Sequence, residues 1–279
     1  MKPNISTFIA CDADYQDAQA VIYGAPFDQT TSFRPGTRFA AQVMRSESFG
    51  IETYSLYLDL DMLDYAIMDA GDLELPFGDV QRSLDMIYEQ AKQILEDDKM
   101  PVLIGGEHLV TLPQCKAVFE KYPDLHIIHF DAHADLRQDY LGQQLSHACV
   151  MRRCYEMLGK GRIFQFGIRS GERSEFAVDG VYTNKFDLST LSDIIPLLKD
   201  KPVYFTLDLD VLDPSVFPGT GTPEAGGVTF KELLSAIHQL RQLNVVAFDV
   251  NELSPAYDHS GVSTAVACKA LREILLSVL

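Results

Sequence analysis

No segment says more about the fold than Ile127-Ile128-His129-Phe130-Asp131-Ala132-His133-Ala134-Asp135. It begins as a mostly apolar run without alternating polar positions, which is typical of a strand covered by helices on both faces. Comparable short runs occur at 20–23, 102–104, 163–166, 203–207 and 245–248. The sequence therefore predicts a sheet whose strands are buried on both sides.

The segments between these runs are long enough for helices. Apolar residues recur at helical spacing in 81–95, in 233–240 and in the last segment, 263–278, so each predicts a helix that covers the sheet. Strands that alternate with helices are typical of an α/β protein. We expect one domain over residues 1–279, with a three-layer α/β/α fold and a mostly parallel central sheet.

The bulk composition restricts the partners. A formal net charge of -17 argues against nucleic acid and anionic membranes, which are bound through Lys and Arg, and suits a small cationic substrate. The five cysteines form no CxxC pair, residues 1–19 show no secretory signal, and no run reaches the roughly 18 apolar residues of a membrane span. We expect a cytoplasmic protein without nucleic-acid or membrane partners, whose cysteines are small buried side chains.

Acidic and histidine side chains follow four of the predicted strands at their carboxyl ends, where open α/β sheets bind ligands. They are His108, Asp131, His133, Asp135, Asp208, Asp210 and Glu252. Alternate spacing in extended backbone directs Asp131, His133 and Asp135 to one side of the chain, and likewise Asp208 and Asp210. An isolated Asp-x-Asp would suit a turn equally well, but its coincidence with the other strand ends favours a shared site.

Carboxylates gathered without Lys or Arg are costly unless a cation neutralises them. Four aspartates and two histidines exceed the ligands of one tetrahedral zinc and match two divalent ions bridged by carboxylate oxygens. Oxygen-rich ligation without thiolate favours manganese over zinc. The sequence thus predicts a site for two Mn²⁺ per chain, formed by His108, Asp131, His133, Asp135, Asp208 and Asp210.

The remaining histidines divide into two groups. His126, His129 and His238 lie within or beside predicted strands and helices, which favours packing or surface roles. His147 lies in a polar loop after Asp135, where an imidazole can exchange protons with the site. His259 is a weaker candidate of the same kind.

In this order, the motifs resemble the signatures of the ureohydrolase family, which includes arginases and agmatinases. The motifs are Gly105-Gly106-Glu107-His108, Asp131-Ala132-His133-Ala134-Asp135, Asp208-Leu209-Asp210-Val211-Leu212-Asp213-Pro214 and Pro218-Gly219-Thr220-Gly221-Thr222-Pro223. Segments 23–28, 34–39, 166–170 and 251–258 also resemble the family, so the likeness covers nearly the whole chain. It implies an arginase-like fold and a binuclear manganese amidinohydrolase.

The resemblance also implies roles for individual residues. It places His108, Asp131, Asp135 and Asp208 around one manganese, and Asp131, His133, Asp208 and Asp210 around the other, with Asp131 and Asp208 bridging. Glu252 corresponds to the glutamate that binds the substrate's guanidinium, and His147 to a proton-shuttling histidine. Asp135 is expected to pass a proton to the leaving amine.

Two positions depart from the family pattern. Glu107 stands where many members have Asp before the histidine, and we expect little consequence. Ala148-Cys149 follows His147 where agmatinases usually have a small residue and then Thr, which bears on turnover and substrate identity.

The substrate depends on what meets the end remote from the guanidinium. Loop 139–146 lacks the Ser and Asn pattern with which arginases bind an α-carboxylate, so the likeness is closest to bacterial agmatinases, which hydrolyse agmatine to putrescine and urea in polyamine biosynthesis. Guanidinobutyrase, formimidoylglutamase and arginase remain alternatives, since Arg137 or Arg153 offers a carboxylate partner. A zinc-dependent acetylpolyamine deacetylase is a further alternative, which the retained acidic ligands disfavour. Family resemblance implies a homo-oligomer, a trimer or hexamer.

Overall fold

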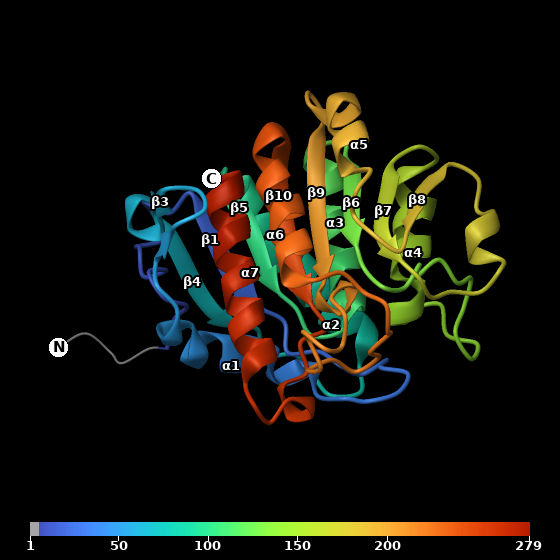
Figure 1. Cartoon of the computed structure of the whole chain (residues 1–279), viewed down its shortest axis with the longest axis horizontal. Helices are drawn as coiled ribbons and strands as arrows, with labels where there is room; N and C mark the ends of the chain where they lie inside the picture. The colour runs from blue at the N-terminus through green and yellow to red at the C-terminus, as the bar shows by residue number, and fades with distance from the viewer. Residues whose placement is uncertain (1–5) are drawn as a thin grey trace.

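The computed structural model describes residues 6–279, so the first five residues of the segment assessed for a signal lie outside it. Its centre is an eight-stranded sheet with helices on both faces (Figure 1). In spatial order the strands are β4 (Ile67–Asp72), β1 (Ala20–Gly24), β5 (Met100–Ile104), β10 (Asn244–Asn251), β9 (Pro202–Asp208), β6 (His126–Phe130), β7 (Ile163–Ile168) and β8 (Val181–Lys185). Every neighbouring pair is parallel, which confirms the predicted sheet.

The helices form two layers that bury separate apolar cores. One layer contains α2 (Val80–Glu96), α3 (Thr111–Lys121) and α4 (Val150–Leu158), which contribute Ile87, Cys115 and Met151 to their core. The other contains α1 (Ala40–Glu47), α5 (Leu191–Leu198), α6 (Phe230–Gln239) and α7 (Val262–Val278), which contribute Met44, Ile194, Leu233 and Leu271. In Figure 1, α6 and α7 cross in front of the sheet and α2, α3 and α4 lie behind it. The three-layer α/β/α prediction is therefore confirmed.

Short elements complete the chain. A hairpin joins β2 (Tyr54–Ser55) to β3 (Leu60–Asp61). The 3-10 turns are η1 (Thr37–Phe39), η2 (Ser48–Gly50), η3 (Met62–Asp64), η4 (His108–Val110), η5 (His147–Cys149), η6 (Glu175–Ala177), η7 (Leu209–Val211), η8 (Leu240–Gln242) and η9 (Pro255–Tyr257). Within residues 6–279, no helix has the length and apolar character needed to cross a membrane. All five cysteines are buried and unpaired, as expected from the sequence.

The apolar runs do not predict the two edge strands, β4 and β8. Their sequences, IMDAGD and VYTNK, are polar, and most of their residues are partly or fully exposed. An edge strand has a neighbour on one side only and less helical cover, so it needs no continuous apolar run.

The central strands bring the candidate residues to one edge. β5, β10, β9 and β6 are consecutive in the sheet and parallel, so the segments that follow them meet at their carboxyl ends. Gly105 and Gly106 make the approach after β5 possible. Their backbone lies against the Asn251 side chain and the Phe27 carbonyl, where a Cβ atom would collide.

Candidate metal centre and active site

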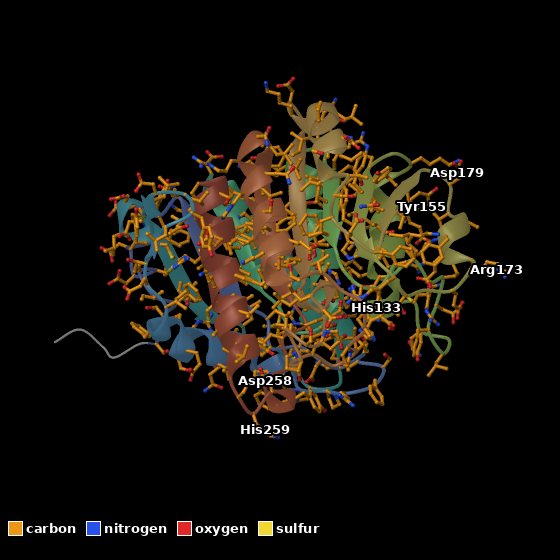
Figure 2. All side chains as sticks on the ribbon, viewed as in Figure 1. His133, Tyr155, Arg173, Asp179, Asp258 and His259 are labelled. Carbon is orange, nitrogen blue, oxygen red and sulfur yellow. The ribbon has the colours of Figure 1, made fainter. Side chains whose placement is uncertain are left out.

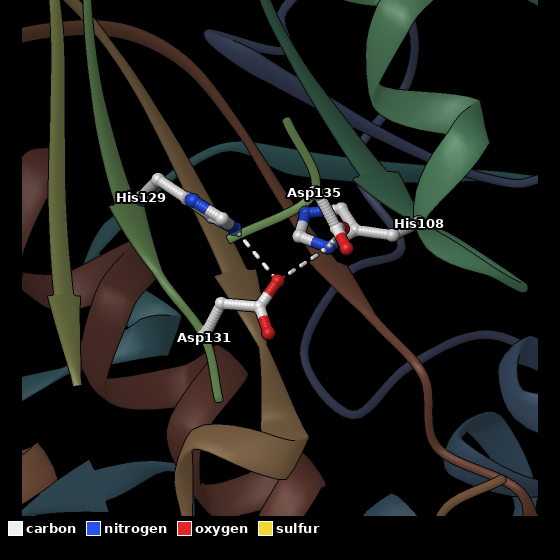
Figure 3. A group of neighbouring side chains, drawn as sticks. All are labelled: His108, His129, Asp131 and Asp135. Atoms are coloured by element: carbon white, nitrogen blue, oxygen red, sulfur yellow. Dashed lines mark hydrogen bonds and ion pairs between the residues drawn. The ribbon is translucent and has the colours of Figure 1, made fainter. Parts of the chain in front are cut away.

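His108 is the centre of the acidic cluster. It begins η4, after β5 and the three-residue segment Gly105-Gly106-Glu107, and its buried Nδ1 has no hydrogen-bond partner. Three carboxylate oxygens face this nitrogen: Asp131 Oδ2 at 3.0 Å, Asp135 Oδ2 at 3.4 Å and Asp208 Oδ2 at 3.2 Å. Figure 3 shows Asp131 and Asp135 converging on the ring from the segment after β6.

The other ring nitrogen establishes which tautomer His108 adopts. Its Nε2 lies 2.8 Å from the Thr206 hydroxyl, and that hydroxyl donates its only proton to Asp249. Thr206 must therefore accept from His108 Nε2–H, which leaves a lone pair on Nδ1. A lone pair facing three carboxylates is repulsive unless a cation lies among them, so these residues fit a divalent metal ion.

His133 forms a second group with two carboxylates. Its Nδ1 lies 3.0 Å from Asp210 Oδ2 and 3.5 Å from Asp131 Oδ1. Asp131 thus contacts both histidines through different oxygens, and the Asp208 carboxylate accepts from the Asp210 backbone N–H at 2.8 Å. All six residues predicted as metal ligands lie together at this edge of the sheet.

His129 contributes to the cluster, which sequence reasoning missed. The Gln165 side-chain N–H donates to His129 Nδ1 at 3.0 Å, so His129 Nε2–H donates to Asp131 Oδ2 at 2.7 Å. Packing alone, as predicted for a histidine within a strand, is therefore an incomplete description. The signal was its position: in an extended chain His129 points to the same side as Asp131.

Burial and crowding shift the acidity of the bridging candidates. Burial opposes ionisation of Asp131, but the histidines around it, His129 first, outweigh burial and hold its pKa well below the usual range. For Asp208, burial and the nearby carboxylates of Asp210 and Asp131 raise the pKa well above the usual range. A bound cation would relieve this repulsion.

Two candidate residues adopt left-handed backbone conformations. Asp135 has φ 54° and Glu252 has φ 65°, a region that few residues other than glycine occupy. Such conformations are retained where the surroundings over-determine them, often at functional sites. Both residues direct their carboxylates at the acidic cluster. Asp135 faces the His108 ring, and Glu252 accepts from the His108 backbone N–H at 2.9 Å.

His147, in η5, lies beside Glu252. Its Nδ1 is 3.4 Å from Glu252 Oε1, and its Nε2 is 2.9 Å from the Ser32 hydroxyl. Burial alone would lower the pKa of His147, but the hydrogen bond and charge of Glu252, aided by Glu107 and Asp135, raise the pKa to about 9. A basic imidazole beside a buried carboxylate is suited to carrying protons.

A cavity of about 210 Å³ opens over the cluster. Its walls include His133, Asp135, His147 and Asp208, together with Arg137, Tyr140 and Glu175. Ala148 lines it, whereas the buried Cys149 directs its thiol toward the Gln143 carbonyl. Ala148, a small residue as in the family pattern, therefore faces the cavity, whereas Cys149, which replaces the usual Thr, is not among the residues that line it.

The other histidines lie apart from this cavity. In Figure 2, His133 lies at the lower end of the sheet, and His259 lies beyond Asp258 at the periphery. His238, on α6, pairs with Glu273, and His126 contacts the Asp124 carbonyl at the opposite end of β6. The packing and surface roles predicted for His126 and His238 agree with these contacts.

The fold and the site together define a metal-dependent hydrolase of the three-layer α/β/α type. Carboxylates and imidazoles from the central strands surround positions suited to cations, with an acid–base histidine alongside. The model of the Arginase family matches residues 18–277, so the chain belongs to the arginase family. It is a ureohydrolase, an enzyme that acts on amidino C–N bonds.

Similar proteins support the same family. The chain is 49% identical to the agmatinase of Bacillus subtilis over 275 residues, covering 96% of this chain and 95% of that protein. A Clostridium difficile structure described as a candidate agmatinase has a TM-score of 0.93 at 49% identity, covering 95% of this chain and 98% of that one. The agmatine ureohydrolase of Thermoplasma volcanium has a TM-score of 0.90 at 32% identity, covering 99% and 94%.

Proposed function

We propose that this ureohydrolase hydrolyses agmatine to putrescine and urea and uses two Mn²⁺ per chain. The agmatinases among its relatives support this choice, since they match over nearly the full length of both chains. The observation that carries it is the charge of the cavity wall outside the acidic cluster. Among the lining residues within 6–279, this wall offers a carboxylate to a cationic substrate and no unpaired Arg or Lys to an anionic one.

Arg137 is the arginine in the cavity wall, and it is already paired. Its Nη1 lies 2.8 Å from Glu172 Oε1 and its Nε lies 3.6 Å from Glu175 Oε2. Arg153 binds the Gln138 carbonyl and Glu156 and is not part of the cavity wall. A substrate carboxylate would have to displace one of these partners, which disfavours arginine, guanidinobutyrate and formimidoylglutamate.

Glu175 offers the opposite charge. Its carboxylate is buried, lines the cavity, and accepts from the backbone N–H groups of Leu136 and Glu172 at 2.9 and 2.6 Å. These bonds fix its position and leave lone pairs for a further donor. The primary ammonium of agmatine is such a donor.

In this proposal the metal ligands divide into two sets that share two residues. His108, Asp131, Asp135 and Asp208 would hold one ion, and Asp131, His133, Asp208 and Asp210 would hold the other. The contact of Asp131 with both histidines supports its assignment as a bridge. Bound divalent ions would lower the pKa of water and so supply a nucleophile at neutral pH.

The protein's own residues orient and protonate the substrate. Glu252, buried and fixed by the His108 backbone N–H, would hold the guanidinium by a charge-assisted hydrogen bond and present its carbon to the attacking water. Asp135 would take the proton of that water and pass it to the leaving amine. His147 would exchange protons between this region and solvent.

A urea-release screen tests the proposal directly. Manganese-loaded protein is assayed with agmatine, arginine, guanidinobutyrate and formimidoylglutamate, and agmatine is expected to give the highest kcat/KM. Metal analysis of the same preparation should give two Mn per chain. One Zn per chain together with deacetylation of an acetylated polyamine would contradict both parts.

A further inference from the structure

Ser32 connects a buried imidazole with solvent. His147 is 8% exposed, whereas Ser32 lies on an exposed part of the loop after β1. Both polar groups of Ser32 face the same ring nitrogen: the backbone N–H donates to His147 Nε2 at 3.1 Å, and the hydroxyl lies 2.9 Å away. The two nitrogens of His147 therefore face different surroundings, Glu252 on the side of the acidic cluster and Ser32 on the solvent side.

This pair of contacts gives Nε2 a partner in each protonation state of His147, with one of the two contacts made at a time. When Nε2 is unprotonated, it accepts from the Ser32 backbone N–H. When Nε2 is protonated, it can donate to the Ser32 hydroxyl oxygen, which has lone pairs available. Burial disfavours the protonated ring and lowers its pKa, but the carboxylates of Glu252, Glu107 and Asp135 outweigh burial and favour the protonated state.

Glu107 holds the Ser32 loop in place. Its fully buried carboxylate accepts from the Thr30 backbone N–H at 3.0 Å, from the Thr31 hydroxyl at 2.8 Å and from the Thr30 hydroxyl. The Thr30 hydroxyl in turn accepts from the His147 backbone N–H at 3.3 Å. One side chain therefore fixes both the loop that carries Ser32 and the turn that carries His147.

This gives a physical meaning to a sequence feature for which we expected little consequence. Aspartate, the residue that many family members carry before the histidine, is one methylene shorter than Glu107. A shorter side chain at this position would not reach Thr30 and Thr31 without movement of the loop.

Beyond Ser32 lies room for water. A second cavity, of about 760 Å³, shares Ser32 and Tyr140 with the cavity over the acidic cluster. Its wall contains uncharged polar groups, among them Gln29, Thr31 and Gln144. Other parts of its wall are apolar, including Val80, Leu141 and Leu145, so water is held at the polar groups near Ser32. Ser32 is itself exposed, and water that reaches it can accept a proton that leaves the hydroxyl.

We infer that the Ser32 hydroxyl passes protons between His147 and solvent, and that Glu107 positions Ser32 for this transfer. In the outward direction, His147 Nε2–H gives its proton to the Ser32 oxygen as the Ser32 O–H gives its own proton to a water. The net change is one proton moved from imidazolium to solvent, with the hydroxyl restored. The inference rests on the proposed proton-carrying role of His147 but not on the identity of the guanidine.

The first test compares Ser32→Ala with Ser32→Thr, which keeps the hydroxyl, and with Ser192→Ala, which removes an exposed serine hydroxyl on the distant helix α5. Ser32→Ala should lower kcat about 10- to 150-fold, the effect expected for one hydrogen bond to a group that becomes charged, with KM and metal content unchanged. Its kcat should also become dependent on buffer concentration, because a small diffusible buffer replaces the missing relay. Ser32→Thr should restore turnover, and Ser192→Ala should match the unmodified enzyme.

Two controls separate this inference from the proposed function. If agmatine is not the substrate, the unmodified enzyme will release no urea from it. The variants are then compared on whichever guanidine the unmodified enzyme hydrolyses. Nitrogen-15 NMR of histidine-labelled protein, with His147 assigned through His147→Gln, reports its protonation without any substrate and should change in Ser32→Ala. A Ser32→Ala enzyme with normal kcat, normal buffer dependence and an unchanged His147 signal would overturn the relay.

Glu107→Asp tests the positioning part. It should lower kcat in the same direction as Ser32→Ala, and the double variant should be no slower than the slower single variant, because both changes break one path. If the two single reductions in kcat multiplied in the double variant, Glu107 would act independently of Ser32. Loss of metal from Glu107→Asp would assign Glu107 to the metal centre instead and overturn the positioning role.

Discussion

His108 Nε2 and the Thr206 hydroxyl are joined by a hydrogen bond of 2.8 Å, and it determines which ring nitrogen faces the acidic cluster. Thr206→Val keeps the shape of the side chain but removes the acceptor, so the tautomer of His108 is no longer fixed. We expect metal affinity at this histidine to fall about 10- to 100-fold, as is usual for the loss of a group that orients a metal ligand. Chelator competition measures the loss. Thr206→Ser retains the hydroxyl and should bind metal normally; equal affinity in the valine and serine variants would contradict the argument.

Asp131 contacts His108 through one oxygen and His133 through the other. Asp131→Asn removes a charge that both proposed ions share, so the variant should lose both metals as well as activity. His108→Ala should weaken one ion selectively. Metal content after dialysis against graded chelator distinguishes the two patterns, and two tightly bound Mn²⁺ in Asp131→Asn would exclude a bridging aspartate.

The predicted ligand residues could be brought together from sequence because parallel strands have their carboxyl ends at one edge. Asp131 and Asp208 directly follow continuous apolar runs, so their positions follow from strand direction alone. His129 and Thr206 could not be recognised in this way. Both lie inside strands where apolar residues would serve equally well. For His129 the one local signal is Asp131 two residues further on, whereas Thr206 meets His108 from a strand two positions away in the sheet.

Loop contacts were still less accessible to sequence reasoning. Ser32 and His147 are 115 residues apart, and no periodic pattern relates one to the other. The edge strand β8 was missed for another reason, since its exposed polar residues give no apolar run. The spacing of apolar residues therefore predicts the buried centre of the sheet, but it does not predict which loops cover the site.

His147→Ala should retain metal and reduce kcat by roughly 10²- to 10⁴-fold, as expected for a positioned acid or base. Burial opposes protonation of this imidazole, but Glu252 outweighs burial and raises its pKa to about 9. If the protonated ring is the active form, kcat/KM of the unmodified enzyme should fall as the pH rises through about 9, and the variant should lack that limb. Added imidazole should restore part of the rate. An unchanged pH–rate profile would reduce His147 to a structural residue.

Glu273 is a buried carboxylate remote from the active site. It accepts from His238 at 2.7 Å and from the Ser55 hydroxyl at 2.9 Å, and it pairs with Arg272. Burial opposes its ionisation, but His238, Arg272 and Ser55 outweigh burial and lower its pKa from 4.5. Because the folded-state pKa lies below the unfolded value, Glu273 stabilises the fold above about pH 4.5, and this contribution is lost as the pH falls through the folded-state pKa.

Glu273→Gln should therefore lower the free energy of unfolding by about 3 kcal/mol at pH 7, the size expected when one member of a buried ion pair is neutralised. The difference from the unmodified protein should shrink below pH 4.5. Denaturant titrations at several pH values measure it, with Glu89→Gln on the exposed face of α2 as the matched control. A deficit that did not change with pH would attribute the effect to packing rather than charge.

Substrate preference is the strictest test of the proposed activity, because the acidic cluster defines the reaction and not the molecule. Arg137 is held by Glu172 and Glu175, so the α-carboxylate of arginine would be desolvated without a partner, whereas the ammonium of agmatine meets the Glu175 carboxylate. A buried charge without its partner costs a few kcal/mol, so agmatine should exceed arginine by more than about 100-fold in kcat/KM.

Added salt should also reduce kcat/KM for agmatine, because a protein of formal net charge -17 attracts a cation through its field. A preference for arginine, guanidinobutyrate or formimidoylglutamate would reject the substrate and leave the ureohydrolase chemistry intact. Arg137 would then be the first residue to substitute, because release of its guanidinium from Glu172 would provide the missing partner for a carboxylate.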